Sequence, residues 1–139
     1  MVRRDVAERK VARASAWLDD AEALLLRPPE EFANDVKARD LACFYLFLAI
    51  QECMDLAAHF VGDAGWAPPD EAASTFDIMA DHAVMDRALA DSMRAAAGLR
   101  NRIAHGYAGL DHRRLRQEAT EGVTALRRFL AAIAAAAGL

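Results

Sequence analysis

The most constraining feature of this sequence is a run of ten consecutive apolar residues, from Leu41 to Ile50, inside a longer helical pattern. That pattern starts after Asn34 or Asp35, either of which can act as an N-cap, and continues to about Val61. A helix that is apolar on every side must be covered on every side by other parts of the protein. We therefore expect the run to form the centre of a helical core, and a second subunit is one candidate for part of its cover.

The rest of the chain also has the pattern of helices separated by glycine and proline. Pro28 and Pro29 end the first helical segment, so residues 30–34 are expected to form a loop, and residues 62–69 another. No alternating strand pattern occurs, and the length of 139 residues suits one domain over 1–139. The sequence predicts an all-α fold, an up-and-down antiparallel bundle of four to five helices. Besides the central helix, helices are expected over about residues 5–26, 71–81, 85–105 and 111–137.

The two cysteines, Cys43 and Cys53, belong to the same expected helix. Ten residues at a rise of about 1.5 Å place them roughly 15 Å apart, which is too far for a disulfide. Neither has a His or Cys nearby at the spacing of metal ligands. We expect both to be small buried hydrophobes, and we expect no metal and no cofactor.

Nothing in the sequence predicts export or insertion into a membrane. The N-terminus mixes Arg, Asp, Glu and Lys without an apolar core. The longest apolar run has ten residues, whereas a helix that crosses a bilayer needs about 20. A soluble cytoplasmic protein with no membrane partner is expected.

Charge is distributed unevenly along the chain. Residues 1–93 carry 9 basic and 18 acidic side chains, whereas residues 94–139 carry 8 basic and 3 acidic ones. All eight basic residues of the second part are arginines. An acidic protein is a poor general binder of nucleic acid, but a local arginine cluster can hold phosphates. A solvated helix face is the alternative interpretation of the same arginines.

The stretch Leu99-Arg-Asn-Arg-Ile-Ala-His-Gly-Tyr107 differs from an ordinary helix surface. Asn101 and Arg102 lie four and three residues before His105 and can share a face with it, whereas Arg100 flanks that face. Arginine grips phosphate oxygens, and histidine moves protons near neutral pH. Together they suit metal-free RNA cleavage, in which the ribose 2′-hydroxyl attacks the adjacent phosphorus. One chain supplies a single well-placed histidine, and a twofold dimer would supply two.

A purely structural interpretation of these residues remains open at this point. Arg, Asn and His near the end of a helix also serve as caps and as partners of the helix dipole. Tyr107 can equally pack against the last helix and tether the loop through its hydroxyl. The other histidines, His59, His82 and His112, stand isolated and are expected to be structural.

The residues Arg100-Asn-Arg-Ile-Ala-His105-Gly-Tyr107 resemble the Arg-x4-His-x-Tyr signature of HEPN-domain proteins, specifically the HepT-like toxin family. The resemblance extends to Ala49-Ile-Gln-Glu-Cys-Met-Asp55, to Ala57-Ala-His-Phe60 and to the loop Gly65-Trp-Ala-Pro-Pro69, and covers nearly the whole chain. One departure is Ala104, where many members have a bulky aliphatic residue. This difference concerns packing more than chemistry.

The resemblance implies a helical bundle that dimerises so that the Arg and His of both subunits meet in one cleft. It implies a metal-independent endoribonuclease of a type VII toxin–antitoxin system, acting on RNA, with tRNA as the implied target. Carried over by position, Arg100 and His105 would be catalytic, and Asn101 or Arg102 auxiliary in RNA binding. The implied partner is a minimal nucleotidyltransferase antitoxin of the MntA kind, which adds AMP to Tyr107.

A rival function belongs to a different class. A non-catalytic HEPN module would bind a nucleotide or a nucleotidyltransferase partner and act as an adaptor. The presence of Arg100, His105 and Tyr107 together favours the enzyme, since an adaptor has no need of all three.

Overall fold

The computed structural model describes residues 3–106 and 109–139 and contains no strand within those ranges. The all-α fold predicted from the sequence is therefore confirmed. The helices are α1 (Arg4–Leu25), α2 (Pro29–Asn34), α3 (Val36–Asp63), the 3-10 helix η1 (Ala72–Ser74), α4 (Thr75–Asp81), α5 (Arg87–Gly106) and α6 (His112–Ala137).

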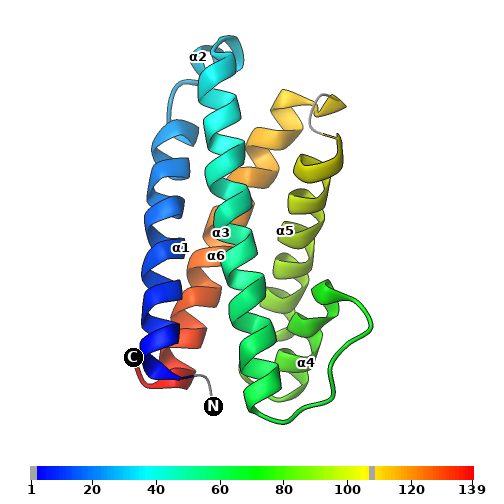
Figure 1. Cartoon of the computed structure of the whole chain (residues 1–139). Coiled ribbons are helices and arrows are strands. Elements are labelled where there is room, and N and C mark those ends of the chain that lie inside the picture. Colours follow the sequence, from blue (N-terminus) through cyan, green and yellow to red (C-terminus); the bar gives the residue numbers. More distant parts are fainter. Residues whose placement is uncertain (1–2, 107–108) are drawn as a thin grey trace.

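Four long helices, α1, α3, α5 and α6, run alternately up and down and form an antiparallel bundle (Figure 1). The short helix α2 caps one end, where α3 and α6 begin and α5 ends (Figure 1). The short helix α4 packs against α3 and α5 at the opposite end. The sequence predicts one α-helix fewer than the described residues contain, because α2 was expected to be a loop.

Helix α2 corrects the expectation of a loop over residues 30–34. Pro29 occupies the first turn, where its missing N–H is no loss, and Glu30 and Glu31 lie beside the positive end of the helix dipole. Phe32 is fully buried in the core and holds the turn against the bundle. The two prolines do end α1, but the second also starts a new helix.

The helix with the apolar run, α3, begins after Asp35, whose side chain accepts a hydrogen bond from the N–H of Ala38 at 3.0 Å. By length and composition α3 could cross a membrane, and half of its most apolar window is buried inside the bundle. It packs against α1, α4, α5 and α6, as the central helix of a core does. The cover is incomplete, because Leu41 and Phe44 remain 45% and 54% exposed.

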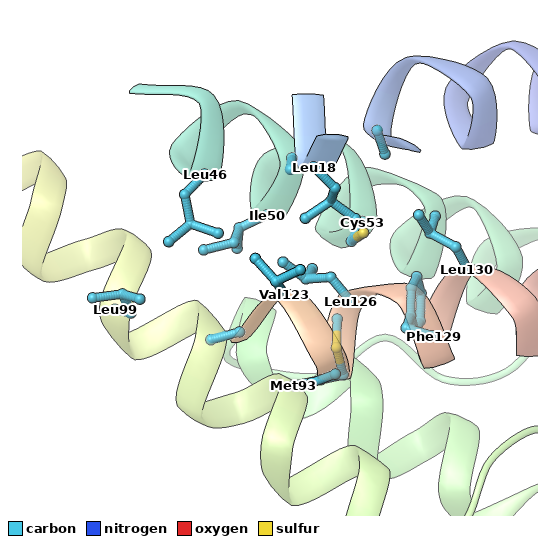
Figure 2. Packing of buried hydrophobic residues seen from close by; sticks show 14 of the residues in the cluster. Leu18, Leu46, Ile50, Cys53, Met93, Leu99, Val123, Leu126, Phe129 and Leu130 are labelled. Carbon is cyan, nitrogen blue, oxygen red and sulfur yellow. The ribbon is translucent and has the colours of Figure 1, made fainter. Parts of the chain in front are cut away.

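The core lies between the four long helices, which each contribute large apolar side chains (Figure 2). Phe129 of α6 meets Phe76 of α4 edge to face, with ring centroids 5.5 Å apart. Cys43 and Cys53 are buried within this core, as predicted. Burial raises the pKa of the Cys43 thiol to about 11 and also raises the pKa of the Cys53 thiol. The labelled core residues of Figure 2 include Leu18, Leu46, Ile50, Met93 and Leu126.

The predicted loop after the central helix is present between α3 and η1. Trp66 stacks on the ring of His82, with centroids 3.7 Å apart, and lies 5.9 Å from Phe60. These aromatic contacts tie the loop to the ends of α3 and α4. The isolated position expected for His82 is therefore wrong, since its ring stacks on Trp66 and its Nδ1 donates to the backbone oxygen of Ile78 at 2.9 Å; these contacts are structural, as the sequence suggested.

Candidate functional site

The Arg-x4-His stretch forms the last turns of α5, which is continuous from Arg87 to Gly106. The helical spacing used to relate Asn101, Arg102 and His105 therefore applies. His105 lies in the last turn with its side chain exposed, and Asn101 is also exposed. Among the described residues, none forms a hydrogen bond or ion pair with the imidazole of His105. The ring is open to a ligand at the end of the bundle that α2 caps.

Arg100 is half-buried and is held by α3. Its Nε donates to Oε1 of Gln51 at 3.0 Å, and its guanidinium carbon lies 5.0 Å from the ring centre of Phe47. Its Nη1 donates to Oδ1 of Asn101 at 2.9 Å. All these partners are neutral, so they position the guanidinium and do not compensate its positive charge. Such a cation can still bind an anion.

The support from α3 was not predicted from the sequence. Phe47 and Gln51 are four residues apart and share one face of the helix, and the Gln51 amide donates in turn to Asp55 at 3.1 Å. The change from apolar residues to Gln51 and Asp55 on α3 was visible in the sequence. It marked a polar face, but it did not identify Arg100 as the partner.

Arg102 points to the other neighbour, α6. Its guanidinium forms an ion pair with Glu118, which also accepts from Nε of Arg114 at 2.8 Å. Arg100 and Arg102 are therefore held by different helices, and within the described residues only Arg102 is paired with a carboxylate. Glu118 and Arg114 were not among the predicted site residues.

A depression of about 330 Å³ lies between the end of α5 and the start of α6. Arg102, Gly106 and Arg114 are among the residues that line it. Glu118 and Asp111 also line it. Asp111 caps α6, and the backbone N–H groups of Arg114 and Arg113 hold the pKa of its carboxyl below the usual range. The depression provides space beside the motif for part of a ligand.

Tyr107, the predicted site of modification, lies outside the described residues. It follows Gly106, the last residue of α5, directly in sequence.

The isolated position predicted for His112 is wrong, because Arg39 of α3 donates a hydrogen bond to its Nε2. This contact joins residues far apart in the sequence, so spacing did not reveal it. In the part of the chain that the structure describes, no group of three or more His, Cys, Asp or Glu side chains is arranged to hold a metal ion.

Several solved structures share this fold. A toxin–antitoxin complex with AMP-PNP superposes with a TM-score of 0.87 at 19% identity, covering 94% of this chain and 98% of that one. The tri-AMPylated HEPN toxin of Shewanella oneidensis, in complex with its MNT antitoxin, gives 0.86 at 20% identity and the same coverage. YutE of Bacillus subtilis, a cytosolic protein of unknown function, gives 0.81 at 18% identity, covering 97% and 90%. At these identities the likeness establishes the fold.

No curated protein matches the sequence. The model of the family described as Ribonuclease HepT-like matches residues 18–133, which include all of α3, α4 and α5 and most of α6. The match therefore includes α5, which carries the motif, and α3, which holds the side chain of Arg100. On this evidence the chain belongs to the Ribonuclease HepT-like family.

Proposed function

We propose that this protein is a metal-independent endoribonuclease that acts as the toxin of a type VII toxin–antitoxin pair. The observation that carries the proposal is the pairing of two groups at one end of α5. Arg100 keeps an uncompensated charge on neutral supports from α3, and His105 presents an open imidazole. This reaction requires a cation that binds the phosphate and a group that transfers protons.

In the proposed reaction the ribose 2′-oxygen bonds to the adjacent phosphorus, and the bond from phosphorus to the next nucleotide's 5′-oxygen breaks. One histidine removes the proton of the 2′-hydroxyl, and a second gives a proton to the departing 5′-oxygen. Arg100 stabilises the charge on the phosphorane, with Asn101 or Arg102 as auxiliary contacts to the RNA. The products are a 2′,3′-cyclic phosphate and a 5′-hydroxyl. The proposed substrate is RNA, with tRNA as its class.

The second histidine comes from a homodimer in this proposal. Leu41 and Phe44 leave an apolar face of α3 exposed, and Phe47, which supports Arg100, lies three residues after Phe44. A second copy packed on this face would cover it and would lie beside Arg100. The whole chain, 1–139, would then act as one cytoplasmic HEPN-like domain in each subunit.

Regulation is proposed to occur through Tyr107. The tyrosine oxygen would bond to the α-phosphorus of ATP, pyrophosphate would leave, and a base on a cognate minimal nucleotidyltransferase would take the proton. The added AMP would bring negative charge to the side chain two residues after His105, where it competes with RNA phosphate for Arg100. The AMPylated toxin among the similar structures supports this assignment.

The test is to incubate RNA with the purified protein in EDTA and to compare His105→Ala and Arg100→Ala with the wild type. We expect both variants to lose cleavage by on the order of 100-fold or more while their helical circular dichroism is retained. Wild-type products should end in a 2′,3′-cyclic phosphate. Cleavage that persists in both variants, or that requires a divalent metal, contradicts the mechanism.

A second measurement tests the control by AMP. The Tyr107→Phe variant keeps the ring but lacks the acceptor oxygen, so it should escape silencing by the nucleotidyltransferase. Mass spectrometry should find AMP on the wild type alone. If the wild type binds the nucleotidyltransferase but cleaves no RNA, the adaptor function is favoured instead.

A further inference from the structure

A second group of cationic side chains lies at the end of the bundle where α2 meets α6. It consists of Arg39 from α3 and of Arg113 and Arg116 from the first turns of α6, with the ring of His112 beside Arg39, and we call these three arginines the cationic cluster. Arg39 donates to His112, and Arg116 donates to the backbone oxygens of Leu25 and Arg27 at 3.1 and 3.4 Å. The cluster therefore joins three segments that are distant in the sequence.

Carboxylates compensate the charge of the cationic cluster only in part, since Asp111 at the start of α6 interacts electrostatically with Arg113 but forms no ion pair with it. Within residues 3–106 and 109–139, no ion pair is formed by Arg39, Arg113 or Arg116, whereas nearby Arg27 pairs with Asp35 at 3.0 Å. The Nε atoms of Arg39 and Arg116 are also buried without a hydrogen-bond acceptor in those ranges. Buried donors normally have a partner, and leaving one unpaired costs free energy. The buried Nε atoms are closed to a ligand at the surface, but the missing ion pairs leave the positive charge of Arg113 and Arg116 available to an anion there.

The surface at the cationic cluster is hollowed. One depression, of about 170 Å³, is lined by Phe32, His112, Arg113 and Arg116, with Glu30 also on its lining. A second, of about 560 Å³, shares Arg113 and Arg116 with the first and has Glu121 on its lining. The two arginines thus line a concave surface beside α2.

The start of α6, to which Arg113 and Arg116 belong, lies at the same end of the molecule as the end of α5, which carries the Arg-x4-His motif (Figure 1). The start of α6 has depressions on two sides: Arg114 lines the depression on the motif side, and Arg113 and Arg116 line those on the α2 side. A strand bound at Arg100 and His105 can therefore continue across the first turns of α6, past Arg114, which is paired with Glu118, to Arg113 and Arg116.

We propose that the cationic cluster is a second phosphate-binding subsite, which holds the backbone of a single-stranded RNA away from the bond that is cut. This inference rests on the proposed ribonuclease function for the identity of the ligand. A phosphodiester suits the cluster because one compact group offers its oxygens to both Arg113 and Arg116, which line the same hollows. Phosphate contacts of this kind position a nucleic acid without reading its sequence.

Binding is measured by fluorescence anisotropy with a labelled single-stranded RNA, and all proteins carry His105→Ala so that the RNA is not cut. Arg113→Gln is the main variant, because Arg113 is exposed and its side chain forms no hydrogen bond or ion pair with the described residues. Arg128→Gln is the matched control, being an exposed arginine of the same helix, paired with Asp86. Arg116→Gln is a second variant within the cluster.

We expect Arg113→Gln and Arg116→Gln to bind the RNA several-fold more weakly than the parent. The slope of log K against log salt concentration should become less negative by about 0.7 for each RNA phosphate that the variant no longer neutralises. Arg128→Gln should change neither quantity. If both cluster variants bind the RNA with the affinity and the salt slope of the parent, the inference is overturned. It is also overturned if the variants lose only the binding of the purified nucleotidyltransferase, because the surface would then be a protein interface.

A cleavage measurement separates this inference from the proposed function. With His105 intact, Arg113→Gln should cut a dinucleotide at the wild-type rate, because so short a substrate does not reach the cluster, and should cut longer RNA more slowly. If longer RNA is cut equally fast, the subsite is wrong while the ribonuclease stands. If the wild type cuts no RNA and Arg113→Gln still weakens RNA binding, the ribonuclease is wrong while the subsite stands.

Discussion

Arg94 and Arg100 both belong to α5, but their side chains are held by neighbouring helices in different ways. Arg94 forms an ion pair with Asp77 of α4, which also pairs with Arg87, and it reaches Ser74 at 3.3 Å. Arg100 is held by the amide of Gln51 and the ring of Phe47. The first arginine joins two helices and has its charge compensated. The second is equally well positioned, but none of these partners compensates its charge. A phosphate-binding group requires such a charge.

The largest expected effect comes from the apolar face of α3, which adjoins the support of Arg100 and not that of Arg94. Phe44→Asp places a charge on this face and should convert the proposed dimer to a monomer, measured by light scattering. Cleavage should fall by on the order of 100-fold or more, because the second histidine is lost. Leu26→Asp is the control, since Leu26 is 77% exposed but lies outside α3. A monomeric wild type, or a Phe44→Asp dimer that cleaves normally, contradicts the dimeric site.

Replacing each arginine by lysine compares the two positions directly. Lysine keeps the charge but loses the planar fork, so Arg100→Lys should reduce kcat by roughly 10- to 100-fold. Arg94→Lys should leave cleavage unchanged, since it can keep its ion pair with Asp77. The measurement is the steady-state rate on one RNA substrate. Equal losses at both positions would mean that Arg100 is merely structural.

Gln51→Glu gives Arg100 the kind of partner that Arg94 has. The new carboxylate would compete with RNA phosphate for the guanidinium, so KM should rise by roughly threefold to tenfold at low salt. Gln51→Met removes the hydrogen bond to Arg100 without adding charge. It isolates the loss of positioning, which should change kcat more than KM, from the competition by the new carboxylate. An unchanged KM in Gln51→Glu would show that the charge of Arg100 does not contact substrate.

The smallest effect is expected at Asp77. Asp77→Asn weakens the ion pairs with Arg87 and Arg94, which are partly exposed, and should lower the free energy of unfolding by about 1 kcal/mol or less. Urea denaturation measures this change. The cleavage rate should remain that of the wild type, and a reduced rate would show that the α4 end of α5 also contributes to function.

Much of the fold was predictable, because long amphipathic helices are specified by local periodicity and by their breakers. The all-round apolar run of α3 placed that helix at the centre, and Asp35 was a recognisable cap. Helix α2 was missed because Pro29 has two opposite meanings, ending one helix and starting another. Only the burial of Phe32 decides between them, and burial depends on tertiary packing.

The motif on α5 was predictable as a set of residues, but its supports were not. Gln51 and Glu118 contact Arg100 and Arg102 from other helices, and these contacts depend on how the helices pack side by side. The same holds for the contact between Arg39 and His112. Helical spacing relates residues on one helix, and it carries no information on which face of a neighbouring helix they meet.

The burial of both cysteines has a practical consequence for spectroscopy. The thiolate is the form that reacts with maleimides, and burial raises the pKa of both thiols, so neither native cysteine is expected to be labelled in the folded protein. A single cysteine introduced at an exposed position such as Asn101 would therefore accept a fluorophore or spin label selectively. In the proposed dimer, distances between the two copies of that label would report on the geometry of the site in solution, without any change to the native core.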